Sequence, residues 1–231
     1  MSASLIRMSA LVLLAASLGG CATPTKMAWA SDSRTAVKPA DAVLLMTATV
    51  RNSYHPSFQP RLIAVDVEKG AAASRDERLN FTPDDKARFK EADSHEEGNT
   101  YLIRMELAPG QYVIRGLALD SPHFPIMGAY FAPLHETLTV SAPGVYYLGH
   151  VQATVRERSG DEFKAGPSIP LIDQAVAGAS GGTFDVEVGD HWDTDEGSFR
   201  SAFPQLGNNP VQKAILGPFD RAYAQKWWAE H

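Results

Sequence analysis

Hydrophobic and polar residues alternate with the period of a β-strand through the middle of the chain. The clearest stretch is Thr100–Asp120, where apolar side chains occupy every second position on both sides of an Ala-Pro-Gly-Gln turn. This pattern predicts a β-hairpin that places Leu107 opposite Tyr112 on one apolar face. The same register places Arg104 opposite Arg115, and we expect both guanidinium groups to be solvated.

Further segments have the composition of strands, and they are separated by loops rich in proline and glycine. Strands are expected at Ala42–Val50, Leu62–Val67, Thr137–Val140, Val145–Val155 and Phe184–Val188. The third and fourth of these are expected to pair as a second hairpin, which turns at a Pro-Gly dipeptide. Loops are expected at Asn52–Pro60, Ser121–Pro133 and, apart from a short strand at Ile169–Ile172, Gly160–Gly182.

Helical patterns are confined to three short segments. One starts at Thr82 within the acidic stretch Gly70–Asn99, which is otherwise expected to be a solvated loop. A second is capped by Asp193 or Thr194 and buries Phe199. The third lies at the end of the chain and carries the more distinctive pattern.

This third predicted helix is Asp220–Glu230. Phe219, Tyr223 and Trp227 recur at four-residue spacing, so they lie on one face of it. A three-turn helix is unstable alone in water, so something must cover that face. We expect the face to pack on the rest of the domain, with Trp227 contributing more than Trp228. The alternative is a partner surface made of Phe219, Tyr223 and Trp227.

One five-residue plan occurs twice, as Ala108-Pro109-Gly110-Gln111-Tyr112 and as Ala142-Pro143-Gly144-Val145-Tyr146. In each copy a Pro-Gly turn precedes a tyrosine that is expected to point inward. With two such turns, residues 41–156 resemble the transthyretin-like and carboxypeptidase-regulatory-like β-sandwiches and several families of uncharacterised bacterial lipoproteins. The resemblance implies no shared catalytic residues. The expected fold class is mainly β: an antiparallel sandwich of the immunoglobulin or transthyretin type with a C-terminal α-helical extension.

The first 20 residues have the layout of a secretory signal. Arg7 precedes an apolar run, Leu11–Leu18, that is too short to span a bilayer. The run ends at Leu18-Gly19-Gly20-Cys21, which resembles a bacterial lipobox. The resemblance implies cleavage before Cys21 and acylation of this cysteine, which then anchors the mature chain. Ala22, in place of an aspartate that would retain the protein at the inner membrane, favours the periplasmic face of the outer membrane.

The chain is expected to divide into a signal peptide (1–20), a flexible tether (21–40), a β-sandwich (41–156) and a C-terminal extension packed on the sandwich (157–231). With 44% hydrophobic and 21% charged residues, the composition is that of an ordinary globular protein with a core. A formal net charge of -6 argues against a nucleic-acid surface. The single cysteine, Cys21, excludes an intramolecular disulfide and a multi-cysteine zinc site.

Two motifs are candidates for chemistry. Gly178–Gly182 matches the G-x-S-x-G pattern of a nucleophile elbow, with Ser180 as nucleophile, but no strand-turn-helix pattern surrounds it. The densest group of metal-ligand residue types is made of four acids, Asp190, Asp193, Asp195 and Glu196. Helix capping explains these acids without a metal, and the histidines are scattered singly along the chain.

The sequence therefore favours a non-enzymatic envelope lipoprotein without a cofactor. Its expected partners are the lipid bilayer, through acylated Cys21, and an envelope protein or cell-wall component that it binds or supports; nucleic acid is not expected. The alternative is an anchored periplasmic hydrolase or metal-dependent enzyme that uses Ser180 or the acids between Asp190 and Glu196.

Overall fold

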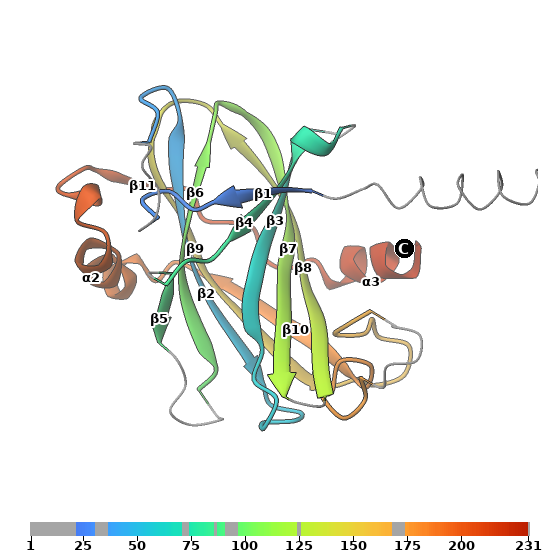
Figure 1. Ribbon diagram of the computed structural model, residues 1–231. Helices are drawn as coiled ribbons and strands as arrows, with labels where there is room; N and C mark the ends of the chain where they lie inside the picture. The colour runs from blue at the N-terminus through green and yellow to red at the C-terminus, as the bar shows by residue number, and fades with distance from the viewer. Residues whose placement is uncertain are drawn as a thin grey trace, which may run out of the picture.

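Two β-sheets packed face to face form the body of the molecule (Figure 1). The computed structural model describes residues 22–30, 37–70, 74–85, 87–90, 97–123, 126–167 and 174–230. Most strand pairs are antiparallel, and a helix lies on each outer side of the sandwich. The fold class expected from the sequence, a mainly β, antiparallel sandwich with a C-terminal helix, is confirmed.

The first sheet, called sheet A here, has five strands in the order β1-β4-β3-β7-β8. Their bounds are β1 Thr23–Lys26, β4 Arg78–Thr82, β3 Arg61–Lys69, β7 Gly110–His123 and β8 Ile126–Val140. β1 pairs with β4 in parallel, and the other neighbours are antiparallel. A short 3-10 helix, η2 (Arg75–Glu77), leads into β4.

The second sheet, sheet B, has the order β10-β9-β2-β6-β5. Their bounds are β10 Gly182–Gly189, β9 Gly144–Glu157, β2 Ala42–Asn52, β6 Asn99–Leu107 and β5 Arg88–Lys90. β2 and β9 run parallel at the centre, and the other neighbours are antiparallel. A sixth strand, β11 (Val211–Lys213), pairs in parallel with the first residues of β9.

Hydrophobic side chains fill both sides of sheet B. In β2, Leu44 and Met46 belong to the core between the sheets, whereas Val43 and Leu45 point to the opposite face. Helix α2 (Trp192–Ala202) covers that outer face. A strand buried on both faces needs no polar alternation, which explains the nearly continuous apolar run in β2.

The hairpin predicted at Thr100–Asp120 is wrong. Its two strands are β6 and β7, and they lie in different sheets, since β6 pairs with β2 and β5 whereas β7 pairs with β3 and β8. Leu107 and Tyr112 are both in the core, but they enter it from opposite sheets. Period-two alternation identifies a buried face and does not reveal whether the next strand lies beside it or across the core. The second predicted hairpin fails in the same way, because β8 belongs to sheet A and β9 to sheet B.

The repeated Ala-Pro-Gly turn carries the chain from one sheet to the other. The hydroxyl of Tyr112 donates a hydrogen bond to the carbonyl oxygen of Ala108 at 2.9 Å, and Tyr146 bonds to Ala142 in the same way at 3.1 Å. A tyrosine that bonds back over a corner is a recurrent feature of β-sandwiches. The repeat seen in the sequence therefore marks two crossovers between sheets.

The loop predicted at Ser121–Pro133 is also wrong, because residues 121–123 and 126–133 belong to the paired ends of β7 and β8. Proline is tolerated here, since Pro122 lies near the end of β7 and β8 is an edge strand. The loop expected after β2 is confirmed between residues 53 and 60. The short strand expected at Ile169–Ile172 lies outside the described residues.

The helix predicted to start at Thr82 is replaced by a turn that leads into strand β5. Asp84 accepts a hydrogen bond from the backbone N–H of Ala87 at 2.9 Å, and such local side-chain bonds compete with helix formation. Asp84 also pairs with Arg104. The side chain of Arg104 is completely buried, so the expectation that it is solvated is wrong. Phe81 of β4 is buried in the core, so this acidic stretch is not simply a solvated loop.

The segment predicted as a flexible tether contains strand β1. After β1, Met27, Ala28 and Ala30 are buried, and the backbone N–H of Ala28 donates to the carbonyl oxygen of Arg104. β1 pairs with β4 through main-chain hydrogen bonds, which require no hydrophobic pattern. A strand of only four residues is therefore not recognisable from the sequence. Cys21 and residues 31–36 lie outside the described residues.

Two helices flank the sandwich, as the sequence led us to expect. α2 begins at Trp192, with His191 as its N-cap residue, so the predicted cap at Asp193 or Thr194 is wrong. Burial of Phe199 is confirmed. A 3-10 turn, η3 (Pro204–Leu206), follows α2, and the C-terminal helix α3 spans Arg221–Glu230.

Candidate functional site

The four acids proposed as metal ligands do not converge on one site. Asp190 pairs with Lys213 at 2.7 Å, and Glu196 pairs with Arg200 of the same helix at 2.7 Å. Asp193 is exposed, whereas Asp195 is buried beneath α2. Among the described residues, no group of three or more His, Cys, Asp or Glu side chains is arranged to hold a metal ion.

Ser180 lies in a series of turns between residues 175 and 181 that lead directly into β10. The strand-to-helix turn of a nucleophile elbow is therefore absent at this serine, because a strand follows it. His191 follows the far end of β10, a strand of eight residues. The structure thus separates the two side chains that a hydrolase at this motif would need to bring together.

The turns before Ser180 close one end of the sandwich. Asn52, at the end of β2, donates its side-chain amide to the carbonyl oxygen of Ala177 at 3.0 Å. The buried hydroxyl of Tyr130 donates to the same oxygen at 2.7 Å. These two bonds fix the glycine-rich segment to both sheets, so its residues have a structural role that the G-x-S-x-G pattern did not suggest.

Asp195 belongs to a chain of polar side chains between α2 and sheet B. The hydroxyl of Tyr147 donates to Asp195 Oδ2 at 2.5 Å, and Nδ1 of His150 lies 3.6 Å from the same oxygen. On the other side of the imidazole, Nε2 of His150 lies 2.8 Å from the hydroxyl oxygen of Thr49. That hydroxyl is in turn 2.9 Å from the hydroxyl of Thr100.

Burial and hydrogen bonding act in opposite directions on Asp195. Burial disfavours the carboxylate, but the nearby imidazole of His150 and the hydrogen bond from Tyr147 outweigh this effect and lower the pKa of Asp195. The pKa of Tyr147 is raised, first by burial and then by its bond to the carboxylate. Asp195 is therefore an ionised acceptor and Tyr147 a neutral donor over the whole neutral range.

The order carboxylate, imidazole, hydroxyl is the order that nucleophilic hydrolases use. Thr49, however, lies in the middle of β2, which has a hydrogen-bonded neighbour on each side. The backbone N–H groups beside its hydroxyl are thus committed to the sheet and do not form an oxyanion hole. The chain of side chains instead links three strands of sheet B to α2.

Aromatic packing supports this structural role. The ring of Tyr147 lies 4.9 Å from Trp192, which stacks on Phe199 at 6.2 Å. Phe199 contacts Phe203 at 6.3 Å, and all four rings belong to the second core between α2 and sheet B. Tyr147 therefore joins an apolar cluster to the buried polar chain, which fixes the position of α2.

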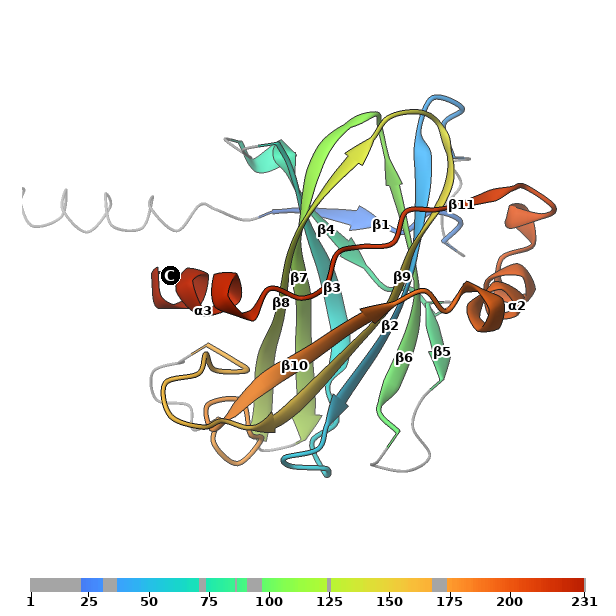
Figure 2. The same ribbon diagram turned by 180° about the vertical axis from the view of Figure 1, so that it is seen from behind.

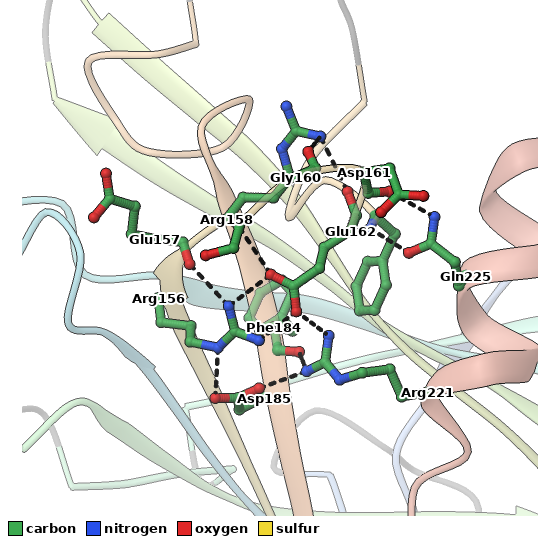
Figure 3. A network of polar contacts seen from close by, with 12 residues as sticks. Arg156, Glu157, Arg158, Gly160, Asp161, Glu162, Phe184, Asp185, Arg221 and Gln225 are labelled. Carbon is green, nitrogen blue, oxygen red and sulfur yellow. Dashed lines mark hydrogen bonds and ion pairs between the residues drawn. The ribbon is translucent and has the colours of Figure 1, made fainter.

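A network of four charged side chains holds α3 in place on the other side (Figure 3). Arg156 of β9 bonds to Glu162 at 2.5 Å and to Asp185 of β10 at 2.8 Å. Arg221, at the start of α3, bonds to the same two acids, at 3.4 Å and 2.5 Å. Hydrogen bonds from Arg156, followed by that from the backbone N–H of Ser159, lower the pKa of Glu162 to about 2.

The aromatic residues of α3 lie at different depths. Trp228 packs against the main core and lies 6.1 Å from the ring of Phe163. Trp227 lies over His135 of β8 at 4.7 Å, whereas Tyr223 is 47% exposed. Both tryptophans are half-buried, but Trp228 packs against the core beside the buried Ala224, so the structure favours Trp228 as the larger contributor to stability.

Asp66 of β3 is a carboxylate that sequence reasoning missed. Its Oδ1 is buried and has no hydrogen-bond partner within the described part of the chain. Burial, followed by the nearby charge of Glu68, raises the pKa of Asp66 to about 6. Glu68 itself is paired with Arg115 at 2.5 Å and with Arg78 at 3.7 Å. Of the two carboxylates, Asp66 is therefore the one whose ionised form is destabilised by burial.

Replacing Asp66 with asparagine should therefore stabilise the protein at neutral pH. A native pKa above the unfolded value means that stability falls as pH rises through the interval from about 4 to about 6. The gain should be about 2 kcal/mol above pH ~7, after allowance for solvent screening, and should shrink towards zero near pH ~4. Urea unfolding of Asp66→Asn and wild type across this range measures it. Asp193→Asn, at an exposed carboxylate, is the control, and an equal gain at both pH values would contradict the assignment.

Comparison of the chain with protein-family models, with curated proteins and with solved structures finds no match. In the described part of the chain, none of the helices is long and apolar enough to cross a membrane.

Proposed function

We propose that this chain is a lipid-anchored lipoprotein of a bacterial cell envelope. Cys21 carries the lipid, and the mature protein is held on the periplasmic face of the outer membrane. Its β-sandwich is a non-enzymatic structural or binding module for an envelope protein or a cell-wall component.

One observation carries the proposal: strand β1 begins only two residues after Cys21. Strand β1 begins at Thr23, and Met27 and Ala28 are already buried. Residues 1–20 have the secretory pattern, so only Cys21 and Ala22 lie between the expected cleavage point and strand β1. A lipid on Cys21 provides an anchor without a membrane-spanning helix.

The geometry of the two candidate sites supports a non-enzymatic role. Ser180 lies in turns that close the end of the sandwich, and the chain from Asp195 to Thr49 links α2 to sheet B. The net charge of -6 speaks against a nucleic-acid partner. A structural or binding role requires none of these groups to react.

Intact-mass analysis tests the proposal. Protein extracted from membranes should have the mass of residues 21–231 plus acyl chains on Cys21. Cys21→Ser should abolish the added mass and shift the protein from the membrane pellet to the soluble fraction. Ser180→Ala is the matched control and should leave both mass and location unchanged, apart from the lost oxygen. A mature N-terminus at any residue other than Cys21, without acyl mass, would refute the lipoprotein assignment.

A further inference from the structure

Helix α3 has an inner side that is fixed and an outer side that is not covered by the described residues. On the inner side, Ala224 is completely buried. Gln225 accepts a hydrogen bond from the backbone N–H of Phe163 at 2.5 Å and donates to the carbonyl oxygen of Asp161 at 2.8 Å. On the outer side lie Tyr223 and Lys226, both exposed.

We call the surface made of Tyr223, Lys226 and Trp227, with His135 beneath it, the α3 face. His135 contacts the ring of Tyr223 at 5.2 Å and that of Trp227 at 4.7 Å. These contacts hold two large aromatic side chains at the surface in fixed positions. Ordered tyrosine and tryptophan side chains at a surface are typical of proteins that contact the headgroup region of a bilayer.

The start of β1 lies on the same side of the molecule as the α3 face. In Figures 1 and 2, β1 runs from the side of α3 towards the side of α2. The contacts agree with this path: Thr23 pairs with Leu79 in sheet A, and six residues later Trp29 lies 6.2 Å from Phe203, which follows α2. The chain therefore enters the sandwich from the α3 side.

Covalent geometry places the lipid close to this side. Consecutive Cα atoms are about 3.8 Å apart, so the Cα atom of Cys21 lies no more than about 8 Å from that of Thr23. With so short a connection, the sandwich has no long spacer to hold it away from the bilayer. The side from which β1 starts must face the membrane when Cys21 is anchored.

We propose that the α3 face rests on the bilayer surface, with Tyr223 and Trp227 among phospholipid headgroups. This inference depends on the proposed function, in which Cys21 carries the lipid. Because the chain has a net charge of -6, attraction to anionic lipid does not supply the contact. The partner is a zwitterionic headgroup layer, which amphipathic aromatic rings and the single cation of Lys226 fit. α2 and the buried polar chain then face away from the membrane.

Single-cysteine variants test this orientation. Cys21 is the one cysteine of the sequence and its thiol is acylated in the proposal, so an engineered cysteine is the sole free thiol. The full-length lipidated protein with Tyr223→Cys is labelled with a fluorophore and placed in phosphatidylethanolamine–phosphatidylcholine vesicles that contain a headgroup nitroxide. Its fluorescence should fall about twofold or more, as for a probe within the interface. Lys226→Cys, one turn further along α3, should respond similarly.

Ser201→Cys is the matched control, because Ser201 is exposed on α2, on the opposite side of the sandwich. Its fluorescence should be unchanged by the nitroxide. Equal quenching at residues 201 and 223, or no quenching at residue 223, overturns the proposed orientation. If the same sample carries acyl mass on Cys21, the lipoprotein assignment still holds. Absence of that mass overturns both. The cysteine at position 223 is also tested for reaction with a soluble maleimide. If it is protected in native membranes but reacts in vesicles that contain no other protein, the α3 face binds a protein partner and the lipid contact is overturned.

Discussion

Replacing Arg104 with alanine should lower the free energy of unfolding by about 3–5 kcal/mol, the range for removal of one partner of a buried ion pair. The side chain is completely buried, and its Nη2 lies 3.0 Å from both carboxylate oxygens of Asp84. It also donates to the carbonyl oxygens of Ala28 and Leu102, and its guanidinium lies 4.0 Å from the ring centre of Phe203. Without it, a carboxylate and two carbonyl groups lose their partner. Urea unfolding of the purified protein gives the change directly.

Arg115→Ala is the control for this experiment. Arg115 is also paired, with Glu68, but its side chain is 30% exposed. The expected loss is below about 1 kcal/mol, as for a surface salt bridge. Arg104→Lys should recover only part of the lost stability, because an ammonium group does not reproduce the guanidinium fork. Equal losses for Arg104→Ala and Arg115→Ala would show that burial of the first pair is not what matters.

Trp228→Ala should lower the free energy of unfolding by about 2–3 kcal/mol, somewhat less than for a completely buried tryptophan. Trp228 packs on the core and on the rings of Phe131 and Phe163, so its loss leaves a gap between α3 and the sandwich. Trp227→Ala should cost about 1 kcal/mol, because its ring also contacts Phe131 but does not pack against the core. Thermal and urea unfolding of the two variants, compared side by side, measure the difference. A larger loss for Trp227→Ala would restore the order that the four-residue spacing alone suggested.

The sequence predicts the strands well because their signal is local. β2, β3 and β10 coincide with apolar runs or alternation, since a side chain's neighbours along one strand are set by the backbone alone. Partner choice between strands is not local. The alternation around Ala108 and Ala142 fits a hairpin and a crossover equally well, and the pairing of the strands on either side distinguishes them.

The chain of polar side chains between α2 and sheet B could not be predicted from the sequence for the same reason. Thr49 and His150 are 101 residues apart, and the parallel pairing of β2 with β9 brings them together. Asp195 is one of four acids that the sequence offers as candidate ligands, and their number does not reveal that this one bonds to Tyr147. Arg104 is a similar case, because its burial depends on Ala28, Asp84 and Phe203, which are distant from it in the sequence.

The parallel pair at the centre of sheet B has a consequence for how the chain folds. Ala42 pairs with Gly144 and Asn52 with Val155, so the central strand gains this neighbour only after more than half of the chain has been synthesised. Contacts between residues so far apart in sequence slow folding, because a long loop must be closed before the pairing stabilises it. The first 140 residues cannot complete sheet B. Under the secretion that we propose, this delay favours a chain that is still incompletely folded when it is exported.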